Sequence, residues 1–134
     1  YAKLRADKLK INVKFYQAKA WKLPFENDFF DSAIAVALLH CIKYKFRRKK
    51  IIRELYRVLK PKAQAFISVW NKTSRRMKNM PKKHKISWRV KGKCIWRDNY
   101  LYDYDELAGE LENAGFKIVR KFENQNNIMV VVKK

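Results

Sequence analysis

The chain has 134 residues, and 48% of them are hydrophobic, which is enough to fill one core and excludes a disordered polymer. Its 33 Lys and Arg residues outnumber 12 Asp and Glu residues, and the formal net charge of +21 favours polyanionic partners, either a nucleic acid or an anionic membrane surface. The longest uncharged apolar run, residues 32–42, is too short for a membrane-spanning helix, which takes about 20 residues.

The amino-terminal third predicts a helix, a strand, a loop and a second strand. Residues 1–10 place apolar side chains among strong helix formers, and residues 13–17 alternate apolar and polar side chains. The Pro and Asx cluster at 23–28 is typical of a loop and turn. Residues 33–39 are continuously apolar, which indicates a strand covered on both faces of a parallel sheet.

The middle of the chain predicts a helix and another buried strand. Residues 46–59 carry apolar side chains at helical spacing, with the basic cluster 47–50 on the outward side. That cluster either tracks phosphates or is a solvated face. Pro61 ends the helix, and the apolar run 63–70 predicts a strand.

The pattern then breaks. Residues 71–97 contain 11 Lys and Arg residues, no acid and only scattered apolar residues. We interpret about 71–99 as a basic insertion in a single domain, outside its core. The scarcity of Glu favours nucleic-acid contact over a merely solvated surface.

Regular structure resumes after the insertion. Asp103 and Glu106 have the spacing of a capping box at the start of a helix that Gly115 ends. Residues 117–122 and 128–132 predict two closing strands around a polar turn at 124–127. A short turn without a helix requires these strands to pair as an antiparallel hairpin, whereas the preceding alternation of strands and helices predicts a mostly parallel sheet.

Three stretches of the first half carry motifs. Residues 18–31, AKAWKLPFENDFFD, match the pattern Asp-Ala-x-x-Leu-Pro-Phe-x-x-x-x-Phe-Asp, with Lys19 in place of the first Asp. Residues 37–40, ALLH, match a strand-end segment before a helix, and residues 53–61, RELYRVLKP, match Glu-x-x-Arg-Val-Leu-Lys-Pro. In this order the stretches resemble the class I S-adenosylmethionine-dependent methyltransferases.

The resemblance implies a Rossmann-like α/β fold with strand order 3-2-1-4-5-7-6, mostly parallel, ending in an antiparallel hairpin. The family's glycine-rich loop after strand one and the acidic residue after strand two do not occur in this sequence, so we expect a partial domain without the first two strands and the amino-terminal cofactor-binding motif. The missing segment is expected upstream, in another chain, or lost in a degenerate copy. The strand at 33–39 then has an unpaired edge, and the strand at 13–17 has no neighbour.

The resemblance also implies S-adenosylmethionine as the cofactor. The residues expected around it are Lys19, Ala20, Val36, Ala37 and His40. In the family an Asp at the position of Lys19 contacts adenine, and a lysine ammonium is a donor only. His40, at a strand end, either packs beside the cofactor or acts as a base.

One turn departs from the family pattern. Its Pro-Gly-Gly turn is Pro61-Lys62-Ala63 here. Lys62 therefore occupies a position that favours positive φ, at a cost of about 1 kcal/mol.

The insertion narrows the resemblance. Ser68-Val69-Trp70-Asn71, the segment WRVKGK at 88–93, and Arg97 followed by Tyr100-Leu101-Tyr102 resemble the tRNA wobble-uridine carboxymethyl methyltransferases. These enzymes convert 5-carboxymethyluridine to its methyl ester. The resemblance implies tRNA and a small zinc-containing activator subunit as partners.

Esterification of a carboxylate needs positioning more than acid or base chemistry, so no catalytic residue is assigned. The expected cationic clamp for the carboxylate and anticodon phosphates comprises Arg89, Lys91, Lys93 and Arg97. Trp88, Trp96 and Tyr100 are expected to stack on unpaired anticodon bases; the alternative for Trp88 and Trp96 is that they anchor the insertion to the body.

The two cysteines, Cys41 and Cys94, have no spacing that makes a metal site, so we expect no metal, reduced thiols and a cytoplasmic protein. Three functions remain open: a tRNA carboxymethyluridine methyltransferase, a noncatalytic RNA-binding or scaffolding remnant, and a small-molecule methyltransferase. The last gives the basic insertion no role.

Overall fold

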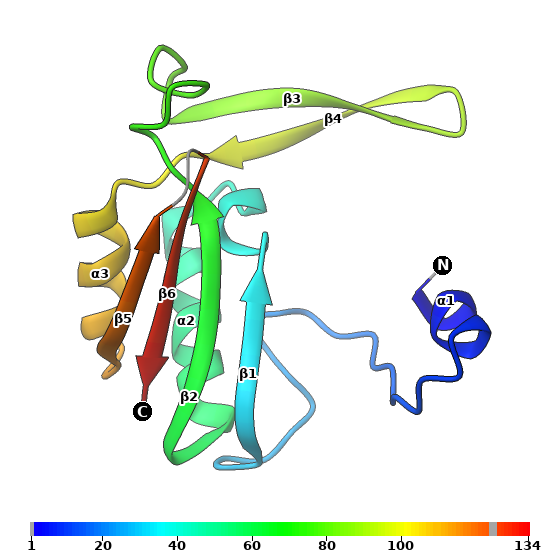
Figure 1. Cartoon of the computed structure of the whole chain (residues 1–134), viewed down its shortest axis with the longest axis vertical. Helices are drawn as coiled ribbons and strands as arrows, with labels where there is room; N and C mark the ends of the chain where they lie inside the picture. Colours follow the sequence, from blue (N-terminus) through cyan, green and yellow to red (C-terminus); the bar gives the residue numbers. More distant parts are fainter. Residues whose placement is uncertain (1, 124–125) are drawn as a thin grey trace.

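The computed structural model describes residues 2–123 and 126–134. Its body is a four-stranded sheet with two helices on one face (Figure 1). The strands, in their order across the sheet, are β1 (Phe30–Val36), β2 (Leu59–Trp70), β6 (Asn127–Lys133) and β5 (Lys117–Glu123). The predicted turn at 124–127 lies partly outside the described residues.

Strand directions in the sheet follow the prediction. β1 pairs with β2 in parallel, so that Ala35 lies opposite Ile67, whereas β6 is antiparallel to both β2 and β5. The mixed sheet with its carboxyl-terminal antiparallel hairpin is thereby confirmed. The order β1-β2-β6-β5 corresponds to the 4-5-7-6 part of the order that the resemblance implied.

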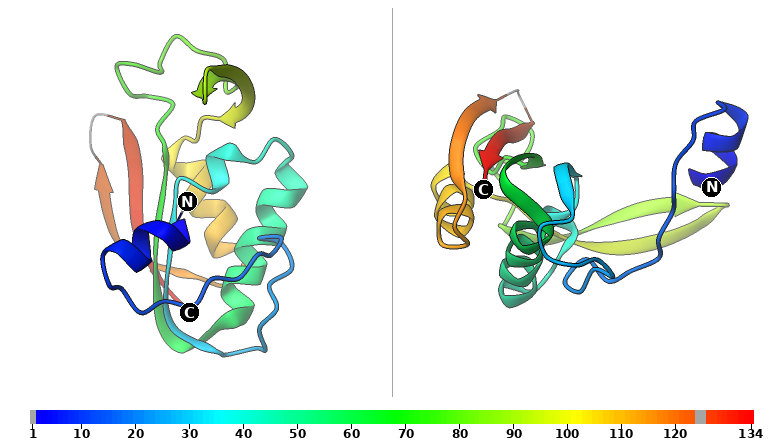
Figure 2. Two further views of the ribbon diagram at one scale, coloured as in Figure 1. Left: turned by 90° about the vertical axis from the view of Figure 1, so that its right-hand side faces the viewer. Right: turned by 90° about the horizontal axis from the view of Figure 1, so that it is seen from below.

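Two helices build the core with this sheet. α2 (Lys45–Val58) and α3 (Tyr104–Glu112) lie side by side on the same sheet face (Figure 2). Their buried side chains Ile51, Ile52 and Leu107 belong to one apolar cluster with the strands. Each such side chain contributes about 1.5–3 kcal/mol through burial. Within the described residues, no helix is long and apolar enough to cross a membrane.

The opposite sheet face is open. Ile34 is 77% exposed and Val36 is 55% exposed, so the prediction that this strand is covered on both faces is wrong. The physical reason is that no helix of the described residues lies on that face (Figure 2). Among these residues only β2 pairs with β1, and the predicted free edge is therefore present.

The amino-terminal segment stands away from the body (Figure 1). Helix α1 (Ala2–Lys8) confirms the predicted helix. The predicted strand at 13–17 is wrong, because residues 11–18 form neither helix nor strand. Phe15 and Tyr16 are exposed there, and no strand of the described residues lies beside them to accept their backbone hydrogen bonds.

The junction between α2 and β2 is tighter than predicted. α2 ends at Val58, and β2 begins at Leu59, so Pro61 lies inside the strand segment and does not end the helix. Lys62 has φ 68°, which confirms the expected left-handed conformation. The predicted strand end near Leu39 is instead a short 3₁₀ helix, η1 (Leu39–Cys41).

The basic segment forms a second sheet of two antiparallel strands, β3 (Lys83–Val90) and β4 (Lys93–Tyr100). This hairpin projects from the top of the body and past β1 (Figure 1). Sequence analysis did not predict its strands. The available signal was the alternation of His84, Ile86, Trp88 and Val90, which the interspersed cations masked.

The base of the hairpin is tied to α3 by charged and phenolic groups. Lys82 forms ion pairs with Asp103 and with Glu106, and the Tyr100 hydroxyl donates to Glu106 at 2.5 Å. Asp103 precedes α3 as predicted, yet its side chain makes no capping hydrogen bond. The predicted capping box is therefore wrong, because both of its carboxylates bind Lys82.

Arg48 is the third tie between hairpin and body. It is 1% exposed, so its predicted place on the outward side of the helix is wrong. Its guanidinium donates to the carbonyls of Ile42 and Lys43, each at 3.2 Å, and lies 3.7 Å from the ring centre of Tyr100. These partners stabilise a buried cation that the helical pattern alone assigned to solvent.

Candidate functional site

The candidate site lies at the carboxyl end of β1, the position where α/β folds bind ligands. Val36 ends the strand, Ala37 follows with φ 56°, and His40 belongs to η1. A positive φ is uncommon for alanine and marks a constrained turn. Three of the five residues predicted to surround the cofactor are thus close in the chain and in space.

His40 is packed against the end of β2. The ring is 3% exposed, stacks on the Trp70 indole at 4.7 Å, and accepts a hydrogen bond from the Trp70 amide at Nδ1, 3.3 Å away. Burial, and then the nearby charge of Arg97, lower the pKa of His40 to about 4. The imidazole is therefore neutral at physiological pH, and an acceptor Nδ1 assigns its proton to Nε2. His40 consequently offers a hydrogen-bond donor but neither a free basic nitrogen nor a positive charge.

A cavity of about 370 Å³ opens beside His40, between the body and the base of the hairpin. Its polar and aromatic lining includes Trp21, Lys43, Tyr44, Arg47, Arg97 and Asp98. Three cations and one carboxylate give this cavity a positive balance. We refer to it below as the cationic cavity.

Cations and rings of the cationic cavity lie in mutual contact. The Arg47 guanidinium is 4.9 Å from the ring centre of Trp21 and 5.5 Å from that of Tyr44. Arg97 Nη2 donates to the Cys41 thiol at 3.1 Å. Guanidinium groups bind carboxylates and phosphates in a planar, bidentate way, and indole rings stack on bases. The cavity therefore suits a planar ligand that carries negative charge.

The hairpin contributes Arg97 from one of its faces and Asp98 from the other to this site. Arg97 lies 5.4 Å from the ring centre of Trp88, so the chain of contacts runs from Trp88 through Arg97 to Cys41. The structure thus brings together Trp88, Arg97 and His40, which sequence analysis predicted as RNA-binding and cofactor-binding residues.

Other predicted RNA-binding residues lie elsewhere. Arg89 is on the opposite face of the hairpin from Trp88, because neighbouring residues of a strand point to opposite sides. Lys91 and Lys93 flank Gly92 at the exposed tip. Tyr100 is 7% exposed beneath Arg48, so its ring anchors the hairpin and is not accessible to a base.

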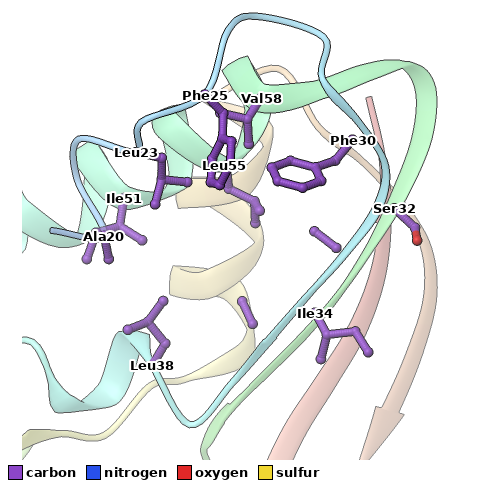
Figure 3. Close-up of a pocket in the computed structure, with 12 residues that line it drawn as sticks. Ala20, Leu23, Phe25, Phe30, Ser32, Ile34, Leu38, Ile51, Leu55 and Val58 are labelled. Carbon is purple, nitrogen blue, oxygen red and sulfur yellow. The ribbon is translucent and has the colours of Figure 1, made fainter. Parts of the chain in front are cut away.

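Lys19 and Ala20 are not among the residues that line the cationic cavity. Lys19 forms an isolated bridge with Lys22, and Ala20 lines an apolar cavity of about 330 Å³ between β1, α2 and the loop before β1. Figure 3 shows Leu23, Phe25 and Leu55 pointing into this cavity, whereas the Ser32 hydroxyl points away. Such a lining provides packing surface but no reactive group.

The spacing of two motifs has a structural explanation that sequence analysis did not give. Glu54 accepts the Leu23 amide at 2.7 Å, and Arg57 donates to the Phe25 carbonyl at 2.9 Å. The Arg57 guanidinium also holds the pKa of Glu54 below its usual value. This pair fixes the loop that carries Trp21, and so positions one wall of the cationic cavity.

Comparison with known proteins gives a family match: the model described as "Methyltransferase domain" matches residues 1–67. A curated relative, the tRNA (carboxymethyluridine(34)-5-O)-methyltransferase of Arabidopsis thaliana, is 47% identical over 53 residues, covering 40% of this chain and 13% of the relative. An uncharacterized protein of Methanocaldococcus jannaschii is 32% identical over 132 residues, covering 86% of this chain and 51% of that protein. The chain therefore spans about half of this relative and far less of the first.

Among solved structures, a SAM-dependent methyltransferase of Methanosarcina mazei superposes with a TM-score of 0.80. The match covers 99% of this chain and 75% of that one, at 20% sequence identity. At this identity the likeness establishes the fold.

Proposed function

This chain belongs to the methyltransferase domain family, and from that premise we propose that it takes part in methyl transfer to the carboxymethyl group of a tRNA wobble uridine. The predicted cofactor, S-adenosylmethionine, is confirmed for the family. The substrate rests on the similarity to the Arabidopsis enzyme and on the cationic cavity.

The residues described here do not by themselves fit the whole cofactor. Neither 18–24 nor 36–42 contains an acid that would accept hydrogen bonds from ribose hydroxyls. Lys19 has no lone pair for the adenine amino group while it is charged. Val36, Ala37 and His40 supply one wall at the end of β1, and we assign no further cofactor contact.

The cationic cavity carries the proposal, because its cations and aromatic rings match the charge and the ring of an anionic pyrimidine. Arg97 and Arg47 would hold the carboxylate of the wobble nucleoside, and Trp21 would stack on its base. A carboxylate is already nucleophilic at neutral pH, so these residues need only orient it and exclude water. The neutral His40 adds no competing positive charge at the strand end.

The basic hairpin supports tRNA as the source of that nucleoside. Eleven cations and no acid within 71–97 would bind the phosphates around an anticodon loop. We include tRNA and a cytoplasmic location in the proposal. The zinc-containing activator subunit stays a prediction.

A noncatalytic RNA-binding role is the second candidate. Lys19, at the position where the family has an adenine-contacting Asp, favours it. It retains the hairpin and the cationic cavity as a binding surface. A small-molecule methyltransferase would need neither the basic hairpin nor the cationic cavity.

A methyl-transfer assay tests the first candidate. The chain is incubated with S-adenosylmethionine carrying a labelled methyl group and with tRNA bearing 5-carboxymethyluridine, and base-labile label in the tRNA is counted. We expect label with this tRNA and none with tRNA bearing unmodified uridine. Arg97→Gln should lower the rate by roughly 10- to 100-fold, the range for losing one charge-assisted contact.

Lys117→Gln is the matched control, because it removes one exposed positive charge from β5, at the far edge of the sheet. This variant should methylate at the wild-type rate. Salt-sensitive tRNA binding without methyl transfer would instead favour the noncatalytic candidate. Equal losses in both variants would contradict the assignment of the cationic cavity.

A further inference from the structure

The two strands of the hairpin give it two chemically different faces. Residues paired across antiparallel strands point to the same side. The pairs Ser87 with Trp96 and Arg89 with Cys94 therefore share a face, which we call the Trp96 face; it also includes the pair Lys85 with Asp98. The pairs Ile86 with Arg97 and Trp88 with Ile95 share the other, which we call the Trp88 face.

The two indoles differ in their surroundings. Trp88 is covered by Arg97, which connects it to the site at the end of β1. Trp96 is 65% exposed, and among the described residues no ring or cation lies over its indole. A role in the hydrophobic core does not account for the tryptophan at position 96, because Trp96 is not part of the apolar cluster.

Cations flank the free indole on its own face. Lys85 and Arg89 lie two residues to either side of Ser87, which is paired with Trp96, so their Cβ atoms are about 7–8 Å from that of Trp96. Both are exposed. The Asp98 carboxylate lies opposite Lys85 on the same face, yet neither Lys85 nor Arg89 forms an ion pair with any residue that the structure describes. A cation on each side of an open aromatic ring is the arrangement that binds a nucleotide strand by its bases and its phosphates.

We propose that the Trp96 face binds unpaired bases of an RNA strand, with one base stacked on Trp96 and the flanking phosphates held by Lys85 and Arg89. This inference rests on the proposed action on tRNA and adds a second contact surface, separate from the cationic cavity. The face discriminates single-stranded from paired RNA, because a base inside a helix has no free surface for the indole.

The placement of the apolar and aromatic residues favours RNA over an anionic membrane as the occupant. A hairpin that enters a bilayer places apolar residues at its tip, whereas this tip is Lys91-Gly92-Lys93. The two tryptophans also lie on opposite faces, so they cannot both lie in one membrane plane.

Fluorescence anisotropy with the full chain tests the proposal. The probes are a labelled oligouridine, which has no base pairs, and an abasic strand of the same length. Trp96→Leu should weaken oligouridine binding by roughly 5- to 100-fold, whereas Trp96→Phe should restore most of the affinity because it retains a ring. The abasic strand should bind wild type and Trp96→Leu equally.

Ile95→Thr is the matched control, since Ile95 is the neighbour of Trp96 on the other face and stays β-branched after substitution. Its affinity for oligouridine should remain within about twofold of wild type. A loss equal to that of Trp96→Leu, an unchanged affinity in Trp96→Leu, or the same loss on the abasic strand would overturn the proposal. Competition by phosphatidylserine vesicles that depends on Trp96 would also overturn it.

Binding of intact tRNA separates this inference from the proposed function. If wild type binds tRNA with steep salt dependence and Trp96→Leu binds oligouridine like wild type, only the Trp96 face is wrong. If wild type binds neither RNA, the proposed action on tRNA is wrong as well.

Discussion

The body and the hairpin use their large apolar side chains in opposite ways. In the body, Ile67, Val69 and Leu107 have no exposed surface, whereas Trp88 and Trp96 of the hairpin are 52% and 65% exposed. The body keeps its shape by burying such groups, and each contributes to stability. The hairpin is held at its base by Arg48, Lys82 and Tyr100, which leaves the side chains beyond the base free to bind.

This difference implies that stability and binding depend on separate residues. A substitution in the sheet should act mainly on the free energy of unfolding. A substitution beyond the hairpin base should act on ligand affinity with little effect on folding. Three measurements test this separation, in order of expected effect.

Truncating the same residue type in each region gives the largest contrast. Ile67→Ala should lower the free energy of unfolding by about 2–5 kcal/mol, because it leaves a cavity in the centre of the sheet. Ile95→Ala should cost about 1 kcal/mol or less, through strand preference alone. Denaturant unfolding of both variants measures this, and similar losses would show that the hairpin is part of the cooperative core.

The junction between the regions should respond to pH through Glu110. Burial raises the pKa of this carboxyl above its ordinary 4.5, while Arg48 opposes the rise. The folded chain therefore binds the proton more tightly than the unfolded chain, so this group contributes stability that is lost as pH rises from about 4.5 through the folded pKa.

Glu110→Gln removes the titrating carboxyl and with it the loss of stability at rising pH. The glutamine keeps an acceptor for the Tyr102 hydroxyl, which lies 3.0 Å from the Glu110 carboxylate. The variant should gain stability over wild type as pH rises, with a slope of at most about 1.4 kcal/mol per pH unit. Denaturant unfolding at several pH values measures the difference. A variant that loses stability relative to wild type as pH rises would contradict the assigned direction.

The smallest effect concerns two of the lysines with positive φ, Lys62 in the body and Lys91 in the hairpin tip, at 68° and 48°. Lys62→Gly should stabilise the chain by about 0.5–1 kcal/mol, because glycine relieves the strained conformation. Lys91→Asn should leave the global melting temperature unchanged, since the tip opens without unfolding the body. Calorimetry measures the melting temperature of both variants. An equal rise in melting temperature would show that the hairpin tip unfolds together with the body.

Much of the body could be predicted because its signals are local. The helical stripe with Ile51 and Ile52, the apolar run before Trp70 and the closing hairpin each repeat with the period of the element that they form. The left-handed conformation at Lys62 was expected from the resemblance, because the family has a glycine at this turn position. These predictions needed no knowledge of what lies beside each element.

The site was predicted less well, because proximity across the chain has no local signal. Arg48 was assigned to solvent and Asp103 to a cap, yet each binds a partner far along the sequence. The strand at 13–17 was predicted from alternation, which is insufficient where no neighbouring strand accepts its hydrogen bonds. Trp21 was not singled out, and Arg47 was considered only as a member of the basic cluster 47–50, although the two form one wall of the cationic cavity.

By itself the sequence determined the class of fold, the order of its elements in the body and the concentration of positive charge between the second strand and the last helix, because periodicity and charge are written along the chain. Only the tertiary structure decided that this basic segment is a ribbon with two unlike faces and that Arg97 joins one of them to the end of β1. The reason is that strand pairing sets which side chains share a face, and pairing depends on contacts between residues that are distant in sequence.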